Sequence, residues 1–234
     1  TGKKDAVGWA KPPMGWNSWD SYRGCIYESR FRDLVDVLAE ELLPYGYEYA
    51  VVDMGWYHPA PDDWNGEDLV DFPVRYQGFK DGKWLPELSM DEYGRLLPDP
   101  VRFPSATNGK GFKPLADYVH SKGMKFGIHI MRGIPRQAVL DKLPIKGTDV
   151  TADKMASRDD FCHWWNNYMF GVDFRSDAAQ AYYNALFDLY AEWGVDFVKV
   201  DDIMVPKYHK YEIEMIRKAI DQCGRPMVLS LSCG

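Results

Sequence analysis

The sequence predicts an α/β fold, a parallel (β/α)8 TIM barrel of which the 234 residues supply roughly the first five strands. Apolar strand-like segments alternate with segments of helical period, which is typical of a parallel sheet. The longest irregular segments follow the strands, where barrels place their functional loops. Neither GxGxxG nor GxxxxGK follows any strand-like segment. Their absence argues against a nucleotide-binding doubly wound sheet.

The chain length predicts a barrel that is only partly contained in the sequence. A complete eight-stranded barrel takes about 250 residues or more, and long loops use much of the 234 residues available. We therefore expect residues 1–234 to form one partial barrel domain that is incomplete at its C-terminus. The apolar fraction of 46% is that of a globular chain with a substantial core.

The first half of the chain contains two predicted strands and one helix. Residues 14–19 are expected to form a short strand. A helix follows from Ser29, taken as its N-cap, to about residue 43, because apolar residues recur at helical spacing. Residues 47–56 form the second strand. Residues 57–110 are rich in Pro, Gly, Asp and Trp without a clear period, which predicts a long functional excursion.

The next segments repeat the same order of helix, strand and loop. A helix over residues 112–122 leads to a third strand over 125–130, and a second long loop covers 131–176. The following helix is expected to begin after Asp177, taken as its N-cap. It ends before Gly194, because a glycine after the last apolar residue of a helix is a typical left-handed cap.

The fourth strand carries the most informative segment, WGVDFVKVDD at residues 193–202. Its apolar residues show no alternating polar face, which predicts a parallel strand covered on both sides. Lys199 lies inside this strand, and Asp201 and Asp202 end it. A buried lysine beside carboxylates needs partners or a ligand, so the segment is either part of a functional site or a structural ion pair. A further helix and a fifth strand follow, over residues 211–223 and 227–234.

Composition excludes several classes of function. The net charge of -7 and the absence of a basic run argue against a nucleic-acid partner. No apolar run reaches the length of a membrane span, so we expect no membrane partner. The chain has no initial Met, which fits the removal of an export signal. We therefore expect a periplasmic or extracellular protein, with a cytoplasmic location as the alternative.

The four cysteines do not predict a metal site. They lack any CxxC or CxxH spacing, which argues against a zinc site. Buried thiols are the expected state, and an exported protein would also permit disulfides. The cysteines are Cys25, Cys162, Cys223 and Cys233.

Polar and aromatic residues collect at the predicted strand ends, which converge on one mouth in a barrel. Indoles pack against sugar rings, carboxylates accept hydrogen bonds from vicinal hydroxyls, and a carboxylate beneath the anomeric carbon can act as a nucleophile. The tryptophans could equally be core residues, and a lone histidine is more often structural. The strand-end residues are Trp16, Trp19, Asp53, Trp56, His129, Arg132, Lys199, Asp201, Asp202, Ser232 and Cys233.

Five ordered segments together resemble the glycoside hydrolase family 27 α-galactosidases of the melibiase clan. The resemblance implies a (β/α)8 catalytic domain followed by a β-sandwich. It also implies hydrolysis of terminal α-linked galactose from an oligosaccharide or glycoside, with retention through a covalent glycosyl-aspartate and without a cofactor or metal. The segments are PPMGWNSW (12–19), YEYAVVDMGW (47–56), LPDPVRFPS (97–105), GFKPLADYVHSKGMKFGIH (111–129) and WGVDFVKVDD (193–202).

The resemblance also implies roles for individual residues. Asp201 matches the catalytic nucleophile, which stands two residues after the family's lysine. Lys199 and Trp19 match the sugar-binding lysine and the tryptophan of the sugar pocket. Asp53 matches the first of two adjacent carboxylates that bind the 4- and 6-hydroxyls. The complete set of expected sugar contacts is Trp19, Asp53, Met54, Trp56, His129, Lys199, Asp202 and Cys233.

Three departures from the family pattern leave the substrate open. Met54 stands where the second carboxylate is expected, and His129 replaces an aromatic residue. His129 or the loop of Arg132 is then a candidate to replace the missing hydroxyl contact. The family's acid/base aspartate falls beyond Gly234. The sugar could therefore be a β-L-arabinopyranoside or an α-glucan instead.

Two other classes of protein remain possible from the sequence. One is a catalytically silent carbohydrate-binding barrel, and the other is a metal-dependent lyase or aldolase that uses Asp53, Asp201 and Asp202. The oligomeric state is left open.

Overall fold

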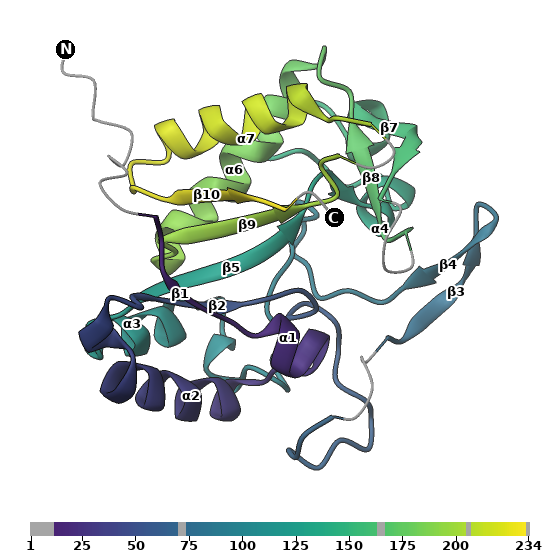
Figure 1. Ribbon diagram of the computed structural model, residues 1–234. Helices are drawn as coiled ribbons and strands as arrows, with labels where there is room; N and C mark the ends of the chain where they lie inside the picture. Colours follow the sequence, from purple (N-terminus) through teal and green to yellow (C-terminus); the bar gives the residue numbers. More distant parts are fainter. Residues whose placement is uncertain (1–11, 70–73, 163–166, 205–206, 233–234) are drawn as a thin grey trace, which may run out of the picture.

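The computed structural model describes residues 12–69, 74–162, 167–204 and 207–232. Its main sheet has five parallel strands, and strands that follow one another in this sheet along the chain are also neighbours in space, which confirms the partial (β/α)8 barrel (Figure 1). The strands, in sheet order, are β1 (Gly15–Asn17), β2 (Tyr49–Val52), β5 (Lys125–Met131), β9 (Phe197–Asp201) and β10 (Val228–Leu231).

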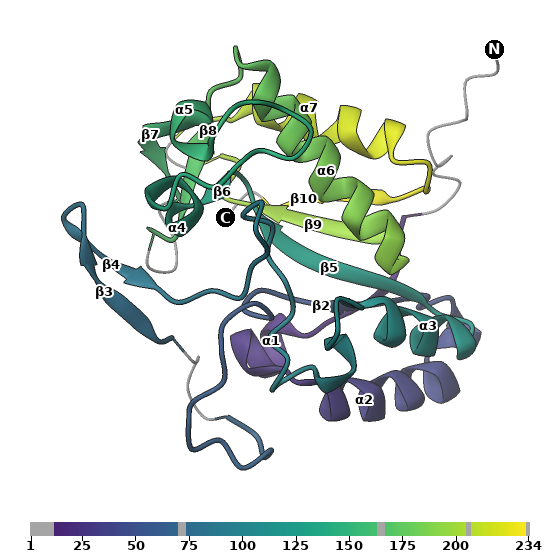
Figure 2. The same ribbon diagram turned by 180° about the vertical axis from the view of Figure 1, so that it is seen from behind.

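Four long helices connect these strands and lie along the outer side of the sheet (Figures 1 and 2). Helix α2 packs against β2, α3 packs against β5 and α2, and α6 packs against α7. No helix of the described ranges combines the length and the apolar composition that crossing a membrane requires. The long helices are α2 (Glu28–Glu41), α3 (Lys113–Ser121), α6 (Asp177–Trp193) and α7 (Lys210–Gln222). The short ones are α1 (Trp19–Tyr22), α4 (Arg136–Leu140), α5 (Ala152–Met155), η1 (Arg23–Cys25), η2 (Leu43–Tyr45) and η3 (Pro104–Ala106).

Two expected helix caps are wrong, by two residues for α2, whose N-cap is Tyr27, and by one residue for α6. Ser29 lies inside α2, which begins at Glu28, and Ser176 rather than Asp177 is the N-cap of α6. The Glu28 carboxylate accepts a hydrogen bond from Arg32 at 2.7 Å. Glu28 and Asp177 both carry negative charge in a first helical turn, where the helix dipole favours it.

Both long loops contain antiparallel strands, although their sequences show no clear period. The first loop forms a projecting hairpin and the second forms a three-stranded sheet, both near the carboxyl ends of the barrel strands (Figure 1). Register irregularities between Tyr76 and Gly78 and between Ser157 and Phe161 interrupt the two-residue alternation that marks a strand. The strands are β3 (Tyr76–Lys80), β4 (Lys83–Pro86), β6 (Ile134–Pro135), β7 (Ala156–Phe161) and β8 (Met169–Val172).

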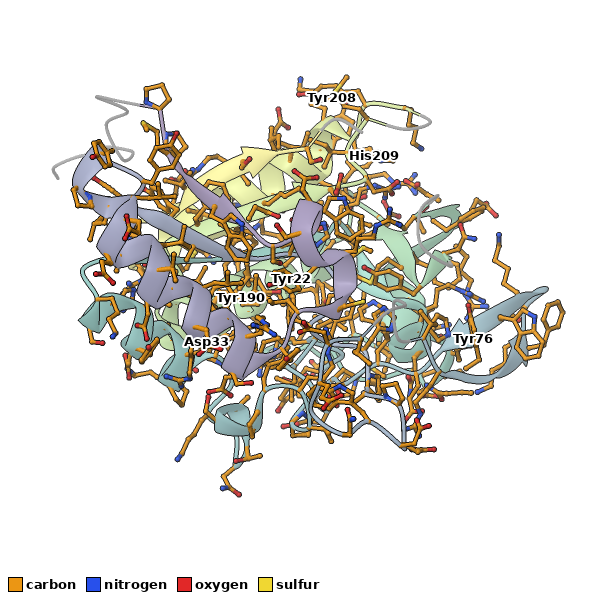
Figure 3. All side chains as sticks on the ribbon, turned by 60° about the horizontal axis from the view of Figure 1, so that its bottom comes forward. Tyr22, Asp33, Tyr76, Tyr190, Tyr208 and His209 are labelled. Carbon is orange, nitrogen blue, oxygen red and sulfur yellow. The ribbon has the colours of Figure 1, made fainter. Side chains whose placement is uncertain are left out.

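The core lies between the sheet and the long helices. Tyr190 of α6 lies in the interior, whereas Tyr76 stands on the projecting hairpin (Figure 3). Strand β9 alternates in burial. Its inner face is only partly covered by the residues described, so the expectation of two covered faces stays a prediction. Val198 and Val200 are buried against the helices, while Lys199 is half-buried on the concave face. The charged residues of β9 therefore lie on the inner face of the barrel.

A glycine at the centre of the sheet leaves room for side chains from both neighbouring strands on the concave face. A Cβ at Gly127 of β5 would come within 2.8 Å of the Val51 side chain and 3.1 Å of Phe197. A side chain at position 127 would therefore have to displace the Val51 and Phe197 side chains.

Candidate active site

The candidate site lies at the carboxyl ends of the parallel strands. Pairing between β5 and β9 places His129 opposite Lys199 and Met131 opposite Asp201. Since alternate residues of a strand share a face, Lys199 and Asp201 point to the same side of the sheet. Asp53, which directly follows β2, reaches the same place. Four residues expected at the site, Asp53, His129, Lys199 and Asp201, are thereby brought together.

Asp53 forms the centre of a buried ion pair. Its side chain is 1% exposed, and its Oδ2 accepts hydrogen bonds from Lys199 Nζ at 2.9 Å and from Asn17 Nδ2 at 2.6 Å. The Met54 N–H donates to Oδ1 at 2.7 Å. Burial raises the pKa of Asp53, but His129, Lys199 and these hydrogen bonds outweigh it and hold the pKa below its usual value. Asp53 is therefore an ionised hydrogen-bond acceptor.

Asp201 stands beside this pair and is more accessible. Its side chain is 17% exposed, its Oδ2 lies 3.2 Å from His129 Nε2 and 3.9 Å from Lys199 Nζ, and the Asp202 N–H donates to Oδ1 at 3.2 Å. Burial raises its pKa, but His129, a Ser232 hydrogen bond and Lys199 lower it to a net value below normal. An accessible, ionised carboxylate has the properties required of a nucleophile.

Trp19 borders a cavity of about 450 Å³ on the concave face. Lys199 and Asn17 line the same end of this cavity, which continues down the sheet to Tyr49 and Phe197. A closed barrel fills that lower part with side chains from its other strands. The cavity adjoins the candidate site at Lys199. It is not lined by the other three residues of that site, Asp53, His129 and Asp201.

Trp56 lies in the core, which corrects the expectation of direct sugar contact. Its side chain is 0% exposed and packs edge to face against Phe112 and Trp193. Its Nε1 donates to the His129 carbonyl at 2.8 Å. Trp56 therefore helps to position β5, and it does not line the pocket.

Two other expected contacts are also buried. The Met54 side chain belongs to the main hydrophobic cluster, and the Asp202 carboxylate lies 3.0 Å from the Arg132 guanidinium. Because Arg132 is 1% exposed and bound by carboxylates, its side chain does not supply the missing hydroxyl contact. That the loop of Arg132 supplies it stays a prediction. Cys233 lies outside the described residues.

Asn17 is the site residue that the sequence analysis missed. It donates to Asp53, and its own Oδ1 accepts from the Trp19 N–H at 2.8 Å. The neighbouring Ser18 Oγ accepts from the Asp53 N–H at 2.9 Å. The sequence contained a signal for this residue. Asn17 lies in the strand expected over residues 14–19, and alternation along β1 places its side chain on the same face of the sheet as Gly15.

The pH dependence of activity should change when His129 is replaced by Phe. The imidazole helps to lower the pKa of Asp201, so its loss favours the protonated carboxyl. The ionised nucleophile is then lost at a higher pH as the solution is acidified. We expect the acidic limb of the kcat/KM profile of the full-length protein to move to higher pH.

His120 supplies a matched control. Its Nε2 lies 2.7 Å from Asp196, at the opposite ends of the same strands. His120→Phe should leave the acidic limb in place. An unchanged limb in His129→Phe would show that this histidine does not set the ionisation of the nucleophile.

The fold and the site define a class of parallel barrel with an ionised carboxylate, a lysine, a histidine and a tryptophan at its mouth. Comparison with known proteins gives the family. The profile of the family described as "Melibiase_2: Alpha galactosidase A" matches residues 74–138. A β-L-arabinopyranosidase of glycoside hydrolase family 27 from Geobacillus stearothermophilus, solved with arabinose, is 53% identical with a TM-score of 0.85. The match covers 97% of this chain and 49% of that one.

Curated relatives agree with this result. Alpha-galactosidase A of Cellvibrio japonicus is 28% identical over 94% of this chain and 37% of its own length. Alpha-N-acetylgalactosaminidase of Gallus gallus is 28% identical over 94% of this chain and 40% of its own. The chain thus spans less than half the length of these relatives. It belongs to glycoside hydrolase family 27, as an α-galactosidase-like domain.

Proposed function

We propose that the protein containing this chain is a retaining, exo-acting glycoside hydrolase. An Asp201 oxygen attacks the anomeric carbon, the bond to the leaving oxygen breaks, and a general acid outside this sequence protonates that oxygen. Water then cleaves the glycosyl-aspartate. The observation that carries the proposal is the accessible Asp201 carboxylate, held ionised beside the Lys199–Asp53 pair.

The preferred substrate that we propose is a terminal β-L-arabinopyranoside, with α-D-galactoside second. The two sugars share their ring stereochemistry, but the arabinopyranose lacks the exocyclic hydroxymethyl group. Met54 has no oxygen with which to bind a sugar hydroxyl, and the 53% identical relative is a β-L-arabinopyranosidase. The resemblance read from the sequence alone favours α-galactoside, because Trp19, Asp53 and Lys199 match the family pattern.

A panel of p-nitrophenyl glycosides tests this proposal with the full-length protein. The panel contains β-L-arabinopyranoside, α-galactoside, α-N-acetylgalactosaminide and α-glucoside, and NMR identifies the anomer that is released first. Retained configuration and fastest release from the arabinopyranoside support the proposal. Inversion contradicts the mechanism, and no turnover at all favours a binding barrel. Loss of activity in EDTA favours the metal-dependent alternative.

Met54→Asp should shift the preference toward α-galactoside. An unpaired carboxylate is costly in the core position that Met54 occupies, so we expect the new side chain to turn toward the mouth, where the family pattern has a carboxylate. A carboxylate that binds a sugar hydroxyl contributes about 1.5–3 kcal/mol, which corresponds to a ratio of about 10 to 100. We expect the ratio of kcat/KM for α-galactoside over β-L-arabinopyranoside to rise by about tenfold, the lower end of that range. Thermal stability should fall, since position 54 is buried in the main hydrophobic cluster.

Met54→Leu is the control for this substitution. It keeps an apolar side chain of similar volume, so the ratio of the two substrates should not change. If the ratio of kcat/KM for the two glycosides is also unchanged in Met54→Asp, position 54 does not determine which sugar is preferred.

A further inference from the structure

Arg132 contacts the backbone of the proposed nucleophile and of the residue that follows it. Its backbone N–H donates to the Asp201 carbonyl at 3.3 Å, and its Nε donates to the Asp202 carbonyl at 2.6 Å. Its Nη2 lies 3.0 Å from the Asp202 carboxylate. One side chain thus binds the main chain and the side chain of the residue that follows Asp201.

The contacts surround an uncommon backbone turn. Asp202 has a φ of 62°, in the left-handed region that residues other than glycine rarely occupy. In this conformation its N–H donates to Asp201 Oδ1 at 3.2 Å. The turn therefore helps to set the orientation of the Asp201 carboxylate, because His129 is bonded only to the other oxygen.

Arg132 is itself fixed by carboxylates from two other elements. Its Nη1 donates to Glu212 of α7 at 2.9 Å, and its Nη2 donates to Asp160 of β7 at 2.8 Å. The Tyr183 hydroxyl donates to the second Glu212 oxygen at 2.6 Å. These contacts connect the end of β5 to α6, α7 and the antiparallel sheet, so the guanidinium is held in one orientation.

A glycine in the antiparallel sheet leaves room for the arginine. A Cβ at Gly171 of β8 would lie 2.9 Å from Arg132 Nη1 and 2.9 Å from Asp160 Oδ2. The sheet formed by the second long loop therefore packs closely around this guanidinium.

We infer that Arg132 is a positioning residue for the nucleophile: it holds the left-handed turn at Asp202 and thereby aims the Asp201 carboxylate at the sugar. The inference rests on the proposed function. Arg132 does not touch the sugar, since its side chain is 1% exposed. Its replacement should therefore affect the chemical step more than substrate binding.

Arg132→Gln in the full-length enzyme tests this inference. A nucleophile displaced by about 1 Å costs about 100-fold in rate, so we expect kcat to fall by about that factor while KM changes little. Single-turnover release of p-nitrophenol, which reports formation of the glycosyl-aspartate, should slow to the same extent. Unchanged kcat and single-turnover rates would overturn the inference.

Arg136 provides a matched control. This buried arginine donates to the carbonyls of Trp84, Asn167 and Lys80, and it contacts no residue of the site in the described part of the chain. Arg136→Gln should lower Tm while kcat stays within about twofold, as for buried groups remote from the chemistry. An equal loss of kcat in both variants would indicate general destabilisation and contradict a positioning role.

A second substitution separates positioning from folding. Asp202→Gly adopts the left-handed turn without strain, so the further loss caused by Arg132→Gln should be much smaller in that background. Equal losses in both backgrounds would overturn the inference. If Arg132→Gln does not fold, Arg132→Lys keeps the charge without the planar fork. A wild-type kcat in Arg132→Lys would then contradict it.

Different results would contradict the proposed function and the positioning role of Arg132. Full activity in Asp201→Asn would overturn the proposed function itself. Inactive Asp201→Asn together with unaffected Arg132→Gln would overturn only the positioning role.

Discussion

Asp201→Asn should reduce kcat by about 10⁴-fold or more, because covalent catalysis has no substitute for the attacking carboxylate. The amide is nearly isosteric with the carboxyl, and the side chain is accessible at the mouth of the barrel. The fold should therefore be retained. The measurements are kcat for the best p-nitrophenyl glycoside of the panel and the thermal melting curve of the same preparation.

Asp202→Asn is the matched comparison. Asparagine also tolerates the left-handed conformation, and the Asp202 N–H that binds Asp201 remains in place. The variant loses only the charge that pairs with Arg132, so its loss of kcat should be much smaller. Equal residual activity in the Asp201 and Asp202 variants would show that the wrong carboxylate has been assigned as nucleophile.

Of the substitutions proposed, Lys199→Met should lower the free energy of unfolding the most. The ammonium is the direct ionic partner of Asp53, a carboxylate that is 1% exposed. Breaking such a buried pair by removing one member costs about 3–5 kcal/mol, because the Asp53 charge loses its direct ionic partner and is left with the hydrogen bonds from Asn17 and the Met54 N–H and the influence of His129. We expect this decrease in the free energy of unfolding by urea. We also expect a strong loss of kcat/KM, since a proposed sugar contact is removed.

A second substitution distinguishes the two losses. Asp53→Asn in the Lys199→Met background removes the buried charge that has lost its ionic partner, so stability should recover while activity does not. Lys122→Met is the surface control, because its pair with Asp36 is solvent-exposed and such pairs contribute about 0–1 kcal/mol. A Lys199→Met protein as stable as Lys122→Met would contradict the buried-pair account of Asp53.

The barrel strands could be predicted from the sequence, because each is a short apolar run bounded by local signals. Gly46, Gly123 and Gly194 adopt the left-handed conformation directly after helical segments, and each precedes a strand by only a few residues. The antiparallel strands could not be predicted from the sequence. They are short and irregular in register, so their pairing depends on contacts between segments that are distant along the chain.

Most of the chemistry at the mouth was also predictable. Asp53, His129, Lys199 and Asp201 lie in the last three residues of parallel strands or directly after them, and parallel strands deliver their carboxyl ends to one place. The roles of Met54, Trp56 and Asp202 were not predictable. Their neighbours along the chain face the site, while their own side chains turn into the core or toward Arg132.

The sequence by itself determined the order of the barrel strands and the residues that end them, because those signals are local and repeat along the chain. Only the tertiary structure decided which polar and charged side chains pair with one another. The partners of Asp53 lie 36 and 146 residues away, and the Glu212 partner of Arg132 lies 80 residues away. Such pairings have no local signal, since they are fixed by sheet register and by the packing of α6 and α7 against the strand ends.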